Sequence, residues 1–203
     1  MTNDGATILS IHYLPCITWF RNFLQNENII LDQHEHFIKQ TYRNRCIILS
    51  ANGPLALTIP VKKIKHHIPM HEMEIENDFN WQKQHWEAIR SAYNTSPFFE
   101  HYTHHFEKFY QNEFNHLSEF NLELIKVCLN ILKVEMEIRL TDTYVHSPAE
   151  GTDWRQAIHP KKKSGENFKP YLQVFASKFS FVPNLSVVDL LFNQGTKAGE
   201  YFL

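Results

Sequence analysis

Two arginines that stand two positions apart are the clearest chemical signal in this sequence. They belong to the run Tyr42-Arg43-Asn44-Arg45. In an extended segment, side chains at positions i and i+2 point to the same side, so both guanidinium groups can converge on one phosphate or diphosphate. Arg43 and Arg45 therefore predict a site for a nucleotide sugar or another phosphate-bearing small molecule.

The charge pattern around these arginines favours the same kind of ligand. Residues 36–71 contain no aspartate or glutamate, although the whole chain has a formal net charge of -2. Concentrated like charges repel one another unless an anion binds among them. We therefore add Lys39 and Lys62 to the predicted substrate-binding residues. A solvated basic face, neutralised by acids from elsewhere in the chain, is the alternative. The six cations of this stretch are Lys39, Arg43, Arg45, Lys62, Lys63 and Lys65.

Two histidines are candidates for general base catalysis, because an imidazole exchanges protons near neutral pH. His85 falls within the apolar arc of the helix predicted from Trp81, together with Ile89 and Ala92. A histidine in that position is either a hydrogen-bonding member of the core or the lining of a pocket. His34 is the other candidate, and the sequence does not choose between the two.

The thirteen histidines of the chain do not form a recognised metal motif. His34 and His36 face one side only in an extended segment, and His101 and His105 lack the glutamate of the His-Glu-x-x-His motif. The three cysteines are far apart, which excludes a disulfide framework or zinc knuckle and fits a reducing cytoplasm. We predict no metal site, and the sequence leaves any cofactor unknown.

The predicted elements indicate an α/β fold in one domain spanning residues 1–203. Strand, helix and strand within about 25 residues predict a right-handed βαβ unit that begins a small mixed sheet. A basic β-hairpin follows, and the second half is mostly helical. Residues 143–169, rich in Pro, Lys, Ser and Gly, are expected to be mobile. The predicted strands are 7–11, 28–31, 46–49 and 55–61, and the predicted helices are 17–25, 81–94, 97–111, 117–133 and 187–193.

Composition narrows the class of protein. The chain has 203 residues, of which 43% are hydrophobic and 14% aromatic, so it is long and apolar enough to fold around its own core. No apolar run is long enough to span a bilayer, and the amino terminus lacks signal-peptide features, so we expect a cytoplasmic protein. No nucleic-acid-binding motif is present and the chain is not basic, so nucleic acid is not an expected partner. The oligomeric state is not predicted.

The pattern as a whole resembles the WbqC-like family, bacterial proteins often associated with O-antigen and other surface-polysaccharide gene sets. The resemblance includes His34, Arg43, Arg45 and His85, but implies no established catalytic residues. The matching stretches span nearly the full length: Tyr13-Leu14-Pro15, Trp19-Phe20, 32–35, 39–45, 57–61, 81–93, 96–99, 183–186 and 189–193.

The resemblance implies transfer of glycine or acyl groups to amino sugars. We therefore expect a cytoplasmic transferase that modifies a nucleotide-activated amino sugar by acyl or aminoacyl transfer. Arg43, Arg45, Lys39 and Lys62 would hold the phosphates, and His34 or His85 would accept a proton. The alternatives are a non-catalytic binding or scaffold protein of the polysaccharide machinery and a nucleotidyltransferase-like enzyme.

Overall fold

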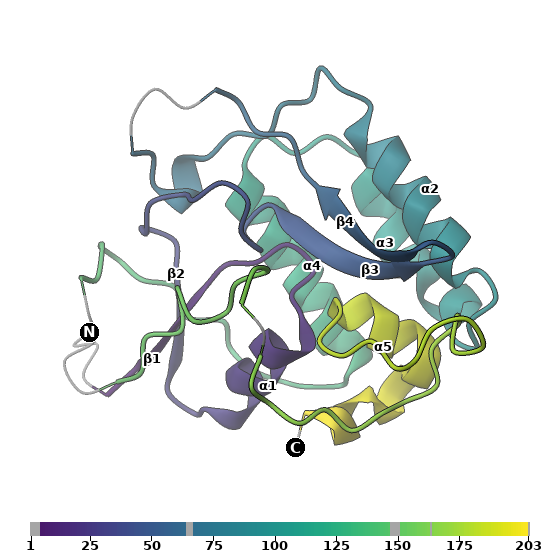
Figure 1. Ribbon diagram of the computed structural model, residues 1–203. Coiled ribbons are helices and arrows are strands. Elements are labelled where there is room, and N and C mark those ends of the chain that lie inside the picture. Colours follow the sequence, from purple (N-terminus) through teal and green to yellow (C-terminus); the bar gives the residue numbers. More distant parts are fainter. Residues whose placement is uncertain (1–4, 64–66, 147–150, 163, 203) are drawn as a thin grey trace.

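The chain begins with the predicted βαβ unit. The computed structural model describes residues 5–63, 67–146, 151–162 and 164–202. Strands β1 (Thr7–Ser10) and β2 (Ile29–Asp32) pair in parallel, with Thr7 opposite Ile29 and Ser10 opposite Asp32. Helix α1 (Ile17–Gln25) connects them, as the purple segment of Figure 1 shows. Every residue of both strands is buried, as is typical of parallel strands that are covered on both faces.

Two further segments extend the parallel pair on its outer edges. The backbone of Ile8 forms a parallel bridge with Asp153, and that of Leu31 forms one with Leu140. Leu31 N–H donates to the Arg139 carbonyl at 2.9 Å, and Trp154 N–H donates to the Ile8 carbonyl at 2.9 Å. These bonds satisfy backbone groups that a two-stranded sheet would otherwise leave unpaired.

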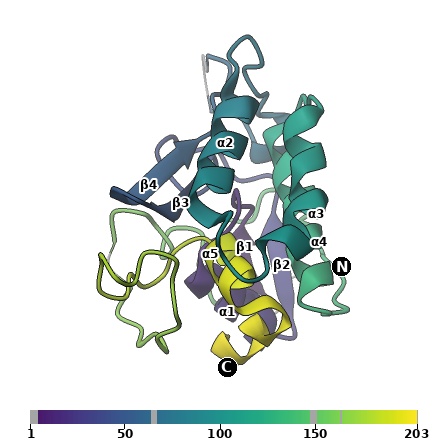
Figure 2. The same ribbon diagram turned by 90° about the vertical axis from the view of Figure 1, so that its right-hand side faces the viewer.

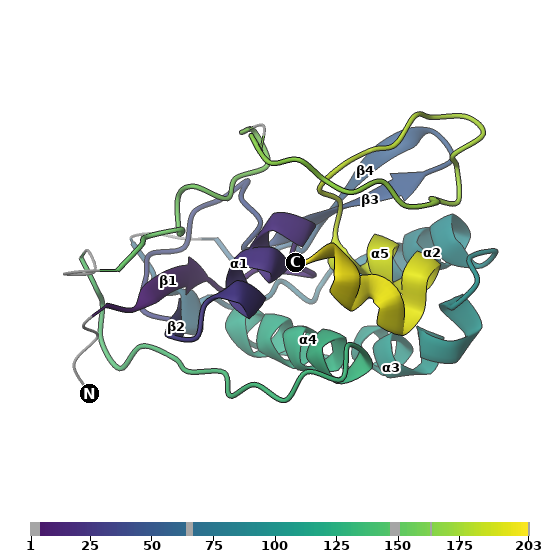
Figure 3. The same cartoon turned by 90° about the horizontal axis from the view of Figure 1, so that it is seen from below.

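The hairpin forms a sheet of its own. Strands β3 (Arg45–Ser50) and β4 (Gly53–Thr58) pair antiparallel, and Gly53 occupies the left-handed region at φ 105° in the turn. The α/β class is therefore confirmed, but the expected mixed sheet is divided into two sheets of two strands. Figure 3 shows the parallel pair near one end of the molecule and the hairpin apart from it.

The helical second half packs around one buried helix. Helix α4 (Leu117–Ile131) buries Leu117, Phe120, Leu124 and Cys128. Figure 2 shows α3 running beside α4. The remaining helices are α2 (Trp81–Tyr93), α3 (Phe99–Gln111), α5 (Val187–Gln194) and the 3-10 turns η1 (Met70–Glu72) and η2 (Gly195–Tyr201). None of the helices described here is long and apolar enough to cross a membrane.

The segment that was expected to be mobile, near residues 143–169, lies partly outside the described residues, since 147–150 and 163 are not described. In its described part, Arg155 and Ile158 are buried. The mobility of the segment stays a prediction.

Candidate functional site

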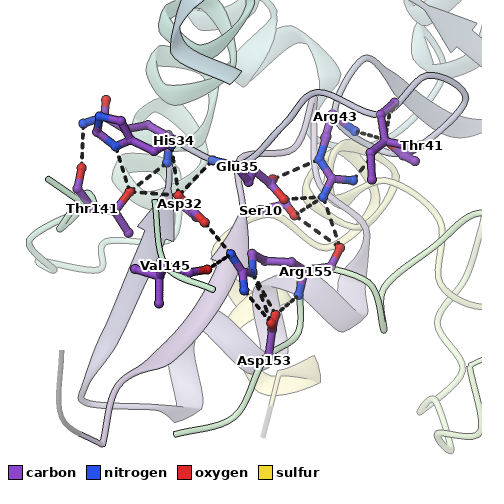
Figure 4. A network of polar contacts seen from close by, with 12 residues as sticks. Ser10, Asp32, His34, Glu35, Thr41, Arg43, Thr141, Val145, Asp153 and Arg155 are labelled. Carbon is purple, nitrogen blue, oxygen red and sulfur yellow. Dashed lines mark hydrogen bonds and ion pairs between the residues drawn. The ribbon is translucent and has the colours of Figure 1, made fainter. Parts of the chain in front are cut away.

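A network of charged side chains lies at the carboxyl ends of β1 and β2 (Figure 4). Ser10 ends β1 and Asp32 ends β2, and this edge of a parallel sheet is where α/β proteins commonly bind ligands. The Asp32 carboxylate is fully buried. Its Oδ1 accepts the backbone N–H groups of His34 and Glu35 and the Thr141 hydroxyl, while Oδ2 accepts Arg155 Nη1 at 2.6 Å.

The second half of the network is the buried pair of Arg43 and Glu35. Arg43 is 1% exposed, and its Nε and Nη2 donate to the two oxygens of the Glu35 carboxylate. Nη2 also donates to Ser10 Oγ at 2.9 Å. Arg155 is bound to Asp153 in addition to Asp32. Each guanidinium of the network therefore has a carboxylate from the same chain as its partner.

The four predicted phosphate-binding residues have different surroundings. Residues 42–43 lie in a turn and are not extended, so the i, i+2 rule does not apply to Arg43 and Arg45. Arg43 is buried against Glu35, whereas Arg45 begins β3 on the face of Ile47. Lys39 is exposed on a loop, and Lys62 pairs with Glu74 on the surface (Nζ–Oε2 2.5 Å).

His85 is buried in the aromatic core, as its position in the apolar arc indicates. Its Nδ1 lies 3.0 Å from the Tyr13 hydroxyl, which contacts the Tyr110 hydroxyl at 2.8 Å. Burial lowers the pKa of His85 to about 4, so the imidazole is neutral at pH 7. Of the two alternatives for His85, this arrangement agrees with a hydrogen-bonding residue of the core. A catalytic role for His85 stays a prediction.

A cleft lies beside the segment that carries Arg155, since Trp154, Ile158 and His159 of this segment line it. It consists of two cavities, of about 240 and 390 Å³, which share Lys162, Ser164, Glu166 and Asn184 in their walls. We call these two cavities together the cleft. The smaller cavity is also lined by Thr18 and His159, and the larger one by Tyr42, Ile47 and Phe168.

The amino end of α1 borders the cleft at Thr18, and its first two backbone amides are already paired. Ile17 N–H donates to the Leu185 carbonyl, and Thr18 N–H donates to Asn184 Oδ1 at 2.9 Å. The Glu166 carboxylate accepts the Thr18 hydroxyl at 2.9 Å and Arg21 Nη1 at 3.1 Å.

One lysine lines the cleft without an acidic partner, and an arginine lies close to the histidine in its wall. Lys162 Nζ donates to the Gln156 carbonyl, and in the described residues no carboxylate pairs with Lys162, His159 or Arg45. The pKa of His159 is lowered by burial and by neighbouring cations, among them Lys162 and Arg45. His159 Nδ1 accepts the Lys161 N–H at 3.1 Å, so a neutral His159 carries its proton on Nε2.

His12 is an unexpected member of this region. It is 1% exposed, and neither of its ring nitrogens has a hydrogen-bond partner within the described part of the chain. Its ring lies 5.6 Å from that of Tyr42, which lines the cleft. Burial, followed by Arg43 and His159, holds the pKa of His12 well below its usual value. His12 is therefore a neutral, buried imidazole next to the cleft.

Sequence reasoning missed most of the cleft. His159, Ser164 and Glu166 fall in the stretch that was read as a mobile loop, and His12 carries no pattern of its own. Two signals were present: Lys161-Lys162-Lys163, and Asn184 within Pro183-Asn184-Leu185. Among the residues that the structure describes, no three His, Cys, Asp or Glu side chains are arranged to hold a metal ion.

The fold and these two regions define an α/β protein with a closed charged network beside an open, partly cationic cleft. The chain belongs to the WbqC-like protein family, whose sequence profile matches residues 11–167. It is also similar to the uncharacterized protein Rv1507c of Mycobacterium tuberculosis (strain ATCC 25618 / H37Rv), with 24% identity over 225 residues that cover 97% of this chain and 96% of the relative. No solved structure matches the chain significantly.

Proposed function

We propose that the protein is a transferase that modifies a nucleotide-activated amino sugar in surface-polysaccharide biosynthesis, and that the cleft holds this substrate. The observation that carries the proposal is a pair of cations without an acidic partner in the described residues: Lys162, which lines both cavities, and Arg45, which lies near enough to His159 of the smaller cavity to lower its pKa. Unneutralised positive charge beside a cavity favours an anionic ligand. Membership of the WbqC-like family is compatible with this role.

The two cavities suit the two parts of a sugar nucleotide. Arg45, Lys162 and the Nε2–H of His159 supply donors to a diphosphate. The aromatic rings of Tyr42 and Phe168 line the larger cavity, whose volume of about 390 Å³ falls within the usual range of small-molecule sites. Rings of this kind can stack on a nucleobase.

The transfer step requires a group that accepts a proton from the sugar amine. As the amine nitrogen bonds to the acyl carbon, the leaving group of the donor departs with its electron pair, and the amine loses a proton. Glu166 is the carboxylate that lines both cavities, so we assign it this proton. His34 and His85, the bases predicted from the sequence, do not line the cleft.

Thermal unfolding in the presence of a panel of nucleoside diphosphate sugars tests the proposal. A sugar nucleotide that binds should stabilise the protein by about 2.7 kcal/mol at 100 times its dissociation constant, which raises Tm. The double variant Arg45→Gln/Lys162→Gln should lose this rise. The matched control is Lys39→Gln, which removes a cation of the same acid-free stretch away from the cleft and should keep it.

Two outcomes would contradict the proposal. Either no sugar nucleotide raises Tm, or Lys39→Gln loses the rise as fully as the double variant. Incubation with the bound sugar nucleotide and acyl or aminoacyl donors then separates a transferase from a binding protein, because only a transferase forms the modified sugar. Binding of nucleoside triphosphates that depends on magnesium would instead favour nucleotidyl transfer.

A further inference from the structure

A pair of histidines stands next to the buried network, apart from the cleft. His34 follows β2, and His71 lies in η1, 37 positions later in the chain. Their ring centroids are 4.6 Å apart, and the ring planes are inclined by 55°. Sequence reasoning paired His34 with His36, whereas the structure places it beside His71. We infer that His34, His71 and Glu72 form a binding site for a divalent transition-metal ion such as Zn²⁺.

The tautomer of His71 is fixed by a backbone group. Its Nδ1 lies 2.9 Å from the Gln33 carbonyl oxygen, which can only accept a hydrogen bond. Nδ1 therefore carries the hydrogen, and a neutral His71 has its lone pair on Nε2. The Gln33 carbonyl also accepts the His71 backbone N–H at 2.9 Å. Because Gln33 precedes His34 in the chain, these two bonds tie the two histidines to each other.

The tautomer of His34 follows from a chain of three groups (Figure 4). The Thr141 hydroxyl donates to Asp32 Oδ1 at 2.9 Å, so its hydrogen is already used. His34 Nδ1 lies 3.2 Å from the same Thr141 oxygen and must therefore be the donor in that contact. The lone pair of neutral His34 is also on Nε2. Histidines that bind metals usually donate their other ring N–H to an oxygen in this way.

Glu72 brings a carboxylate to the same place. Its Oε1 lies 3.6 Å from His71 Nε2, and its side chain is 62% exposed. When His71 is neutral, its Nε2 lone pair and the Glu72 carboxylate are both available to a cation bound between them. Two ligand atoms on one tetrahedral zinc lie about 3.3 Å apart, and the rings of two zinc-bound histidines about 5 Å apart.

The three residues are not yet arranged as a complete metal site, since no set of three ligands in the described residues has that geometry. The exposed Glu72 side chain must rotate to complete it, whereas the two histidines are already held by their Nδ1 hydrogen bonds. Two imidazoles and one carboxylate leave at least one coordination position open, as in catalytic zinc sites. The site does not depend on the function proposed for the cleft.

Calorimetric titration of the full chain with Zn²⁺ tests the inference, and Co²⁺ absorption reports the geometry. The wild type should bind one equivalent far more tightly than any other. His34→Gln and His71→Gln should each weaken that equivalent at least tenfold, and Glu72→Gln should weaken it less. The matched control is His101→Gln/His105→Gln, which removes a pair of histidines at i, i+4 on α3, away from His34 and His71, and should leave the tight equivalent intact.

Three results would overturn the inference. The wild type could show no saturable tight equivalent, the tight equivalent could persist in both single-histidine variants, or the control could lose it. Thermal unfolding of each variant without metal shows whether it is folded. If a histidine variant does not fold, Glu72→Gln still tests the inference, because this exposed side chain can be changed without disturbing the core.

Discussion

The buried network and the cleft are two charged regions of one molecule, and one segment contributes Arg155 to the network and His159 to the cleft. In the network, Arg43 and Arg155 each bind a carboxylate of the chain itself. In the cleft, Lys162 has no such partner among the described residues. Charged side chains that pair with each other hold segments of the chain together. A charged side chain without a partner remains available to bind a ligand of opposite charge.

Arg43 and Arg45 are near neighbours in the sequence but have different surroundings in the fold. They are two residues apart, yet one is enclosed in the network and the other lies beside the cleft. The chain turns at residues 42–43, so the two side chains do not follow the alternation of an extended strand. Positive charge alone therefore does not identify a binding residue, because the partner that each side chain finds in the fold decides its role.

The largest expected effect comes from breaking the network. Arg43→Met leaves the Glu35 carboxylate buried without its cation, which should lower the free energy of unfolding by about 3–5 kcal/mol. Urea unfolding of the variant and the wild type measures this loss. A change within experimental error would mean that the pair does not hold the fold.

The next largest effect is a fall in the free energy of unfolding at acid pH. The pKa of His85 is about 4 in the folded protein and about 6.5 when unfolded, so below pH 6.5 only the unfolded chain gains this proton. The free energy of unfolding should therefore fall by about 1.4 kcal/mol per pH unit between pH 6.5 and 4 through His85. Burial also lowers the pKa of His12, which adds to the loss.

Urea unfolding at pH 7, 5.5 and 4.5 measures this slope. His85→Phe should keep the ring packing and make the slope shallower. An unchanged slope in His85→Phe would show that other groups cause the acid sensitivity.

A smaller effect is expected for ligand binding in the cleft. A bound diphosphate places negative charge near His159 and should raise its pKa from the lowered value of the free protein. The affinity for a nucleoside diphosphate sugar, whose diphosphate does not titrate near neutral pH, should therefore increase several-fold from pH 7.5 to 5.5. Calorimetry should show this increase in the wild type and its absence in His159→Gln. A wild-type affinity independent of pH would remove His159 from the diphosphate site.

The smallest effect is expected for an ion pair that lies outside both the buried network and the cleft. Lys62 and Glu74 pair on the surface, where solvent weakens the attraction between them. Lys62→Gln should change neither the free energy of unfolding in urea nor the Tm rise with a sugar nucleotide. A loss of that rise would return Lys62 to the substrate-binding residues predicted from the sequence.

Local patterns predicted the elements of this fold well. Helix α1 covers the predicted residues 17–25, and α2, α3, α4 and α5 agree with their predicted ranges to within about two residues at each end. Turn residues likewise predicted the hairpin around Gly53. These features depend on periodicity and turn chemistry within short windows, which a single sequence displays.

The site could be predicted only in part, because it depends on contacts between distant segments. Glu35 binds Arg43 across eight residues, but Asp32 binds Arg155 across 123, and no pattern in the sequence connects them. The same holds for His34 beside His71 and for the cleft between Thr18 and Glu166. The predicted anion site depended on an extended run at 42–45, whereas residues 42–43 form a turn and Arg43 is buried against Glu35.

A crystal structure of the protein with a bound nucleoside diphosphate sugar tests the central claim most directly. The account predicts that the diphosphate lies in the cleft, within hydrogen-bonding distance of Arg45, His159 and Lys162, with the base or sugar against Tyr42 and Phe168. A diphosphate bound elsewhere on the molecule, with the cleft empty, would contradict it.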